Sequence, residues 1–152
     1  MVVLAVHLKH GFMGPAENGE RISSVVGQGV PEQLRRAVII DDEPAFVEVL
    51  KKMLSGLSYE VAVSTDSSAS STFDVSDDDI VFLDVLMPNT SGLRVLEQLA
   101  RQQAKCAIVL MSGSVDRLDA AEKYAESLQL NLVGALEKPF RLAEVSLVLE
   151  GI

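Results

Sequence analysis

The sequence lacks the features that mark a secreted or membrane protein. It has one cysteine and no tryptophan among 152 residues. A single cysteine cannot form an intrachain disulfide, so a reducing compartment is favoured, and Cys106 is expected to be buried because it lies in an aliphatic run. No apolar run reaches the roughly 18 residues of a membrane span, and the first residues lack the basic start and cleavage site of a signal peptide. These absences predict a cytoplasmic protein with no membrane partner.

Positive charge is also scarce. The chain carries 13 Lys and Arg against 22 Asp and Glu, which gives a formal net charge of -9. Such a balance repels a phosphate backbone, so we expect no direct binding to nucleic acid. Hydrophobic residues make up 48% of the chain, which is enough for the core of one α/β domain and excludes disorder throughout.

Glycine and proline are concentrated in residues 1–36, and the composition turns aliphatic at Ala37. We therefore expect residues 1–36 to be an N-terminal extension or linker and residues 37–152 to be a single domain. Residues 2–8 are apolar enough to add a strand, but the surrounding glycines and prolines favour the linker.

From residue 37 onward, short apolar runs alternate with amphipathic stretches, which is typical of βα units around a parallel sheet. Strands are expected at residues 37–41, 60–63, 80–84, 107–112 and 133–137. Helices are expected at residues 45–57, 92–102, 116–128 and 141–149, with Thr90 or Ser91 as the N-cap of the second of these four. Residues 66–79 predict only a short or frayed helix, because they are rich in serine and end in three aspartates, which we interpret as a solvated loop.

The ends of these strands carry the polar residues of a candidate site. Asp41 and Asp42 stand at the end of the first strand, Asp84 ends the third, Ser112 ends the fourth and Lys138 follows the fifth. The carboxyl ends of parallel strands meet at one edge of a sheet, where ligands bind. Three carboxylates there imply a cation such as Mg²⁺, beside which an aspartate can attack an activated phosphoryl group. Lysine and serine would donate hydrogen bonds to the phosphoryl oxygens.

Four segments together resemble the receiver domains of two-component response regulators: VIIDDEP at 38–44, VFLDVLMPNTSGLRVLEQL at 81–99, IVLMSGS at 108–114 and LEKPF at 136–140. The resemblance covers about residues 37–150. It implies an α/β fold with a doubly wound five-stranded parallel sheet flanked by five helices, flavodoxin-like, with strand order 2-1-3-4-5.

The resemblance also implies a role for each site residue. Asp84 would be the phosphoacceptor, and Ser112 and Lys138 would complete the catalytic set. The metal ligands for Mg²⁺ would be Asp41, Asp42, Asp84 and the backbone carbonyl of Leu86. The peptide bond between Lys138 and Pro139 would be cis.

The function implied is a switch that at most catalyses its own phosphorylation and dephosphorylation. A sensor histidine kinase, a phosphotransfer protein or a small phosphodonor would phosphorylate Asp84. The output domain would be fused or separate, and the GALEKPF ending resembles receivers fused to cyclic-di-GMP phosphodiesterase domains. A homodimer is compatible with this reading. Ala135 departs from the family, because many receivers place a Tyr or Phe there that moves on activation.

Two other functions stay open at this point. The first is a docking or dimerisation module that keeps the acidic pocket but is not switched by phosphorylation, and Ala135 motivates it. The second is a small Mg²⁺-dependent phosphotransferase or phosphatase. It is disfavoured because no second carboxylate stands two residues after Asp84.

Overall fold

The computed structural model describes residues 6–8, 34–64, 74–88 and 90–152. Its strands and helices follow one another along the chain as strand, strand, helix, strand, and then a regular alternation of strands and helices. They are β1 (Val6–Leu8), β2 (Arg36–Ile40), α1 (Pro44–Gly56), β3 (Glu60–Ser64), β4 (Ile80–Asp84), α2 (Gly92–Arg101), β5 (Ala107–Ser112), α3 (Val115–Ser127), β6 (Leu132–Glu137) and α4 (Leu142–Glu150).

The strands form one sheet in the order β1-β6-β5-β4-β2-β3. The pairs from β6 to β3 are all parallel, which confirms the doubly wound sheet and its order 2-1-3-4-5. Each expected strand is found within one residue of its predicted bounds. β1 is an addition to the five: it pairs antiparallel with β6, with Val6 opposite Leu136. The segment that the glycine and proline content assigned to a linker thus contributes an edge strand.

Four of the five expected helices lie within the described residues, each displaced by at most one residue from its predicted ends. The remaining expected helix, at residues 66–79, falls largely on residues 65–73, which lie outside the described part of the chain. The described remainder, residues 74–79, forms turns rather than a helix. Ser91 is the N-cap of α2, where its hydroxyl accepts a hydrogen bond from the Leu93 amide at 3.2 Å.

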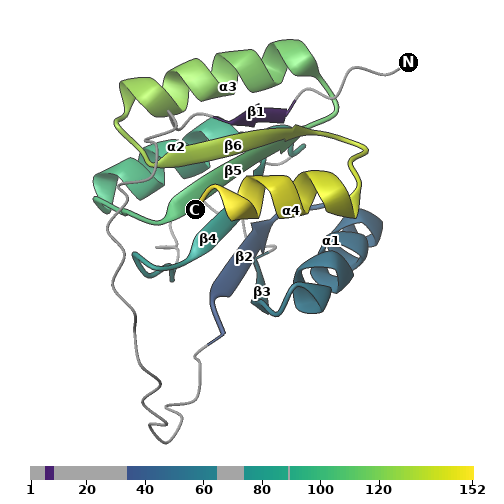
Figure 1. Cartoon of the computed structure of the whole chain (residues 1–152). Coiled ribbons are helices and arrows are strands. Elements are labelled where there is room, and N and C mark those ends of the chain that lie inside the picture. Colours follow the sequence, from purple (N-terminus) through teal and green to yellow (C-terminus); the bar gives the residue numbers. More distant parts are fainter. Residues whose placement is uncertain (1–5, 9–33, 65–73, 89) are drawn as a thin grey trace, which may run out of the picture.

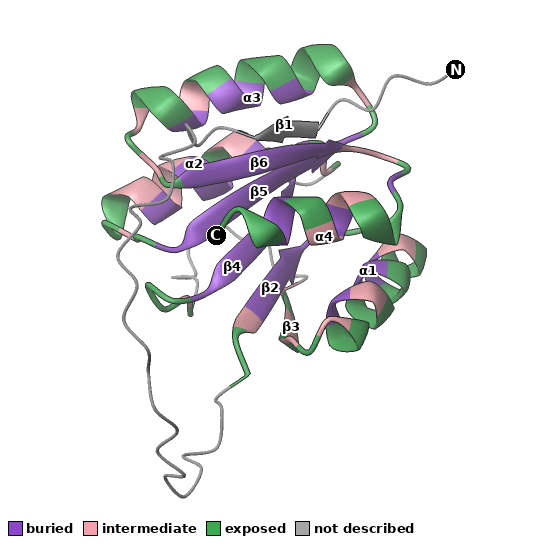
Figure 2. Cartoon of the chain, in the orientation of Figure 1, coloured by how far each residue is buried: buried purple, intermediate pink, exposed green. Residues whose placement is uncertain are grey.

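Helices cover both faces of the sheet, with α2 and α3 on one side and α1 and α4 on the other (Figure 1). In β4, Val81 and Leu83 pack toward α2 and α3, whereas Ile80 and Phe82 pack toward α1 and α4. Successive side chains of a strand point to opposite faces, so a sheet covered twice must be apolar on both. Figure 2 shows the result: the central strands are buried, and the helices are buried on their inward side.

The same alternation positions the acidic side chains. Asp84 is the last residue of β4 and continues the row of Ile80 and Phe82, which places it on the side of α1 and α4. Asp41 comes directly after β2 and continues the row of Ala37 and Ile39 toward the same side. Because both strands run parallel, the two carboxylates emerge together at the carboxyl edge of the sheet.

The opposite edge holds an ion pair with a buried carboxylate, which was not predicted from the sequence. Asp79 is only 5% exposed, and its Oδ2 lies 3.2 Å from Nη2 of Arg36. It also accepts a hydrogen bond from the Ser76 amide at 2.8 Å. The prediction of a solvated loop is therefore wrong for Asp79, although Asp77 and Asp78 are exposed.

Cys106 is fully buried near this ion pair, as expected. Burial raises the pKa of its thiol to about 11, and the charges of Asp79 and Asp77 act in the same direction. None of the described helices is long and apolar enough to cross a membrane.

Candidate functional site

Three carboxylates gather at the carboxyl edge of the sheet. Asp41, Asp42 and Asp84 each offer one oxygen within 4.8 Å of the oxygens of the other two. Asp41 and Asp84 are buried, whereas Asp42 is exposed. In both buried residues, one carboxylate oxygen accepts a hydrogen bond from the backbone. Asp41 Oδ1 accepts from the Glu43 amide at 2.9 Å, and Asp84 Oδ1 accepts from the Leu86 amide at 3.1 Å. These bonds fix the two carboxylates and leave their Oδ2 atoms free for a cationic partner.

Lys138 supplies that partner in the structure. Its Nζ lies 2.6 Å from Asp41 Oδ2 and 3.6 Å from Asp84 Oδ2, and its side chain is 13% exposed. The backbone amide of Lys138 donates to the carbonyl of Ser112 at 2.9 Å, which ties the residue to the end of β5. The ammonium therefore bridges two strand ends that are distant in sequence.

The cluster carries excess negative charge when its three carboxylates are ionised, since Lys138 balances one of them. Burial raises the pKa of Asp84 to about 6. The Leu86 amide and the Lys138 ammonium act against this rise, while the charge of Asp41 adds to it. Ionisation of Asp84 at neutral pH therefore lowers the stability of the folded state through desolvation, and a further cation would offset this loss.

The loop after Asp84 is packed closely against the start of α2. Gly92 donates its amide to the carbonyl of Val85 at 3.3 Å. A Cβ at this glycine would lie 2.6 Å from the backbone oxygen of Asp84 and 2.8 Å from Cα of Val85, closer than side chains approach. Glycine is needed here because the backbone of Asp84 lies where any side chain would begin.

The remaining predicted residues lie at the same edge. Ser112 is fully buried at the end of β5, and its hydroxyl accepts a hydrogen bond from the Ser114 amide at 3.1 Å. The bond between Lys138 and Pro139 is cis, as expected. Ala135 is buried in β6, opposite Leu110 of β5, with no aromatic ring at this position.

Two aromatic residues at this site were not singled out by the sequence analysis. The ring centroid of Phe46, in the first turn of α1, lies 3.9 Å from Lys138 Nζ. Phe140 meets Phe46 at right angles, with 5.3 Å between their centroids. Phe46 is partly buried and also packs against the core cluster between α1 and the sheet. The sequence signal that could have identified Phe46 as part of the site is its position, four residues after Asp42.

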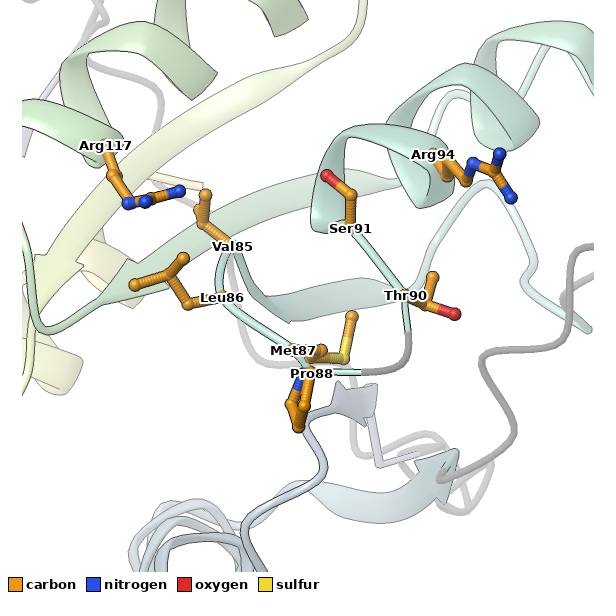
Figure 3. A pocket seen from close by; sticks show the side chains of 8 residues that line it. All are labelled: Val85, Leu86, Met87, Pro88, Thr90, Ser91, Arg94 and Arg117. Atoms are coloured by element: carbon orange, nitrogen blue, oxygen red, sulfur yellow. The ribbon is translucent and has the colours of Figure 1, made fainter.

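A hollow of about 330 Å³ lies beside the acidic cluster. Figure 3 shows it between the loop after Asp84 and the starts of α2 and α3, with Arg117 extending toward Val85 and Leu86 and Arg94 projecting from α2. None of the three carboxylates lines it. The acidic cluster therefore lies next to this hollow without lining it.

The arrangement can hold a divalent cation on oxygen ligands and can present Asp84 as a nucleophile beside a fixed ammonium. A doubly wound parallel sheet with such an acidic edge defines a class of small α/β regulatory domains. Comparison with known sequences makes this specific: residues 37–150 match the response regulator receiver domain. The chain therefore belongs to the family of response regulator receiver domains.

Individual relatives agree with this assignment. The positive alginate biosynthesis regulatory protein of Pseudomonas aeruginosa is 31% identical over 114 residues, which cover 72% of this chain and 43% of that protein. The transcriptional regulatory protein FixJ of Azorhizobium caulinodans is 33% identical over 105 residues, with 67% and 47% covered. The chain thus spans less than half the length of these relatives. The crystal structure of a response regulator from Colwellia psychrerythraea is 28% identical, has a TM-score of 0.67, and is matched over 77% of this chain and 98% of that one.

Proposed function

We propose that this receiver domain is a phosphorylation switch in which Asp84 accepts the phosphoryl group. The supporting observation is the place of Asp84: a buried carboxylate at the end of a central strand, beside two more carboxylates and 3.6 Å from an ammonium. No other described group of three metal-ligating side chains gathers in this way. The geometry therefore favours Asp84 over the exposed carboxylates of the helices.

The residues of the cluster fit Mg²⁺ as the cofactor. Asp41, Asp42 and Asp84 offer hard carboxylate oxygens, and the backbone carbonyl of Leu86 would add another oxygen ligand. Burial raises the pKa of Asp84 even with Lys138 beside it, so a bound divalent cation would favour the ionised carboxylate. When bound, Mg²⁺ would neutralise charge on the phosphoryl oxygens and keep Asp84 ionised.

In the proposed step, a carboxylate oxygen of Asp84 forms a bond to phosphorus as the bond from phosphorus to the donor's leaving atom breaks. The electron pair of the broken bond stays on the leaving group, which is an imidazole nitrogen for phosphohistidine and a carboxylate for an acyl phosphate. Asp84 must be ionised to attack, and a pKa of about 6 leaves most of it ionised above pH 7. The role of the protein is mainly to position these groups.

The product needs donors for its oxygens, because an aspartyl phosphate carries close to two negative charges. Lys138 is within reach, since its ammonium already lies between Asp41 and Asp84. Ser112 would contribute its hydroxyl from the end of β5. The change of charge at these strand ends would favour a second conformation of the loops and helices that follow them.

The phosphodonor would be a sensor histidine kinase, a phosphotransfer protein or a small phosphodonor, as the family implies. The output domain would be fused or separate, because the relatives extend well beyond the matched region. A cyclic-di-GMP phosphodiesterase is one such output, and a homodimer is compatible with it.

Intact mass spectrometry tests the proposal. The protein is incubated with acetyl phosphate, with Mg²⁺ or with EDTA, and samples are quenched over seconds to minutes. We expect one phosphoryl adduct that needs Mg²⁺, disappears in Asp84→Asn and persists in Asp78→Asn, a control at an exposed aspartate. Reduction with borohydride would convert the phosphorylated residue to homoserine and locate it at position 84.

A specific observation favours one second function. Ala135 has no ring that could move when Ser112 engages a phosphoryl group, so a docking module that works without phosphorylation has a physical basis. That function predicts no adduct at any time point, and self-association or partner binding that is the same for the wild type and Asp84→Asn. An adduct at position 84 that changes self-association would instead exclude it.

A further inference from the structure

Lys138 has an unusual set of neighbours on its ammonium. Two sides of the group face carboxylate oxygens, of Asp41 at 2.6 Å and of Asp84 at 3.6 Å. A third side faces the ring of Phe46, with Nζ 3.9 Å from the ring centroid. This distance is well inside the roughly 6 Å limit of a cation–π contact.

We propose that Phe46 is a positioning residue for the phosphorylation of Asp84: its ring holds the Lys138 ammonium over the acidic edge, ready to contact the phosphoryl oxygens. The inference rests on the proposed function and adds a residue to it. Phe46 touches neither Asp84 nor the donor in this account, and acts only through Lys138.

The need for such a residue follows from the chemistry of lysine. Its ammonium sits on a flexible four-carbon stem, is strongly hydrated, and carries three donors that rotate freely. An aromatic face attracts the cation electrostatically but offers no lone pair that would compete with phosphoryl oxygens. With Phe46 on one side, water is displaced from that side, and the donors of Lys138 are directed to the carboxylates.

The orientation of the Phe46 ring is itself fixed. Phe140 packs against it at 90°, with 5.3 Å between centroids, and is 7% exposed. Phe140 stands two residues after Lys138, so one short segment supplies both the cation and the support for the ring beneath it. Phe46 comes from the first turn of α1, directly after the acidic pair. The contact therefore links the ends of β2 and β6 across the site.

The contribution of the ring's electrons can be separated from that of its volume. Phe46→Tyr keeps the aromatic face, whereas Phe46→Leu keeps an apolar side chain without it. Tyr59→Leu is the matched control, because Tyr59 is half-buried against the same core cluster. Mono-, di- and trifluorinated phenylalanine, introduced at position 46 by amber suppression, withdraw charge from the ring face with little change of shape.

The readout is the rate constant of adduct formation at saturating acetyl phosphate and Mg²⁺. We expect Phe46→Leu to lower it about three- to tenfold, the factor to which cation–π contacts convert. Phe46→Tyr should stay within about twofold of the wild type, the fluorinated series should fall stepwise, and Tyr59→Leu should be unchanged. The donor concentration for half-maximal rate should not move. A flat fluorinated series, or equal rates for the Leu and Tyr variants, would overturn the inference.

A second measurement needs no phosphodonor and tests the contact between Phe46 and Lys138 directly, independently of the phosphorylation rate. The ring face of Phe46 should shift the NMR signals of the Lys138 ε-methylene protons upfield, and this shift should vanish in Phe46→Leu but not in Tyr59→Leu. Absence of the shift in the wild type refutes the placement of Lys138 over the ring. If the wild type takes up no phosphoryl group at position 84 although the shift is present, the proposed function fails and with it the catalytic role of the contact.

Discussion

Replacing Asp84 by asparagine should stabilise the metal-free protein at neutral pH, although it removes the proposed phosphoacceptor. The carboxylate is buried, its side chain being 6% exposed, and burial raises its pKa from about 3.8 to about 6. The folded state therefore holds this group ionised at a cost that the unfolded chain does not bear. Asparagine has nearly the same shape and no charge, so the cost disappears in the variant.

The size and sign of the effect follow from the two pKa values. Between about pH 4 and pH 6 the folded protein binds a proton at Asp84 that the unfolded chain has released, so this group makes stability fall as pH rises through that window. A shift of about two pKa units corresponds to about 3 kcal/mol, which is reached above pH 6. Asp84→Asn should thus equal the wild type near pH 4 and exceed it by up to about 3 kcal/mol at pH 7.5.

Urea unfolding followed by circular dichroism, in EDTA and at several pH values, measures this difference. Addition of Mg²⁺ should stabilise the wild type more than the variant and narrow the gap, since the ion binds the ionised cluster. Asp79→Asn is the contrasting control: its carboxylate is equally buried but paired with Arg36, so the substitution should destabilise. A variant at position 84 that is less stable than the wild type at pH 7.5, or a gain that does not depend on pH, would refute the reasoning.

Three further outcomes follow from the structure. Gly92→Ala should lose about 2 kcal/mol in urea unfolding because its Cβ would meet the backbone of Asp84, whereas Gly56→Ala, in open space on α1, should gain about 0.5–1 kcal/mol. Cys106 should be alkylated by iodoacetamide at pH 8 at least about 100 times more slowly in the folded protein than in urea, as its raised pKa requires. Arg36→Met should cost about 3 kcal/mol of unfolding free energy by leaving a buried carboxylate unpaired, and should leave the phosphorylation rate unchanged.

Most of the fold could be predicted because its signals are local. Four- to six-residue apolar runs alternate with helical periodicity, and four of the five predicted strands end in, or are followed by, a polar residue that marks the edge of the sheet. The positions of Asp41, Asp84 and Lys138 followed from those ends, and the structure brings their side chains into contact. The parallel topology predicts that these residues lie together, because the carboxyl ends of all the parallel strands are at one edge of the sheet.

The features that were missed depend on contacts between distant segments. β1 is three residues long and pairs with β6 at the far end of the chain. The apolar character of residues 2–8 allowed a strand there, but the surrounding glycines and prolines outweighed that signal. Asp79 belongs to an acidic run and is buried only because β4 begins at the next residue and Arg36 faces it. Phe46 fits a helical apolar stripe equally well whether its ring touches only the core or also an ammonium.

The buried carboxylates at the amino and carboxyl edges of the parallel strands differ in how fully their charge is compensated, and this difference bears on function. At the amino edge, Asp79 has Arg36 as its own partner, which makes that edge a fixed part of the fold. At the carboxyl edge, one ammonium serves two buried carboxylates and an exposed third lies beside them, so ionisation there lowers stability. A cation that binds only the folded, ionised cluster recovers that free energy as affinity. The free energy by which the ionised cluster destabilises the fold at pH 7.5 is therefore the free energy that would strengthen the binding of a cation.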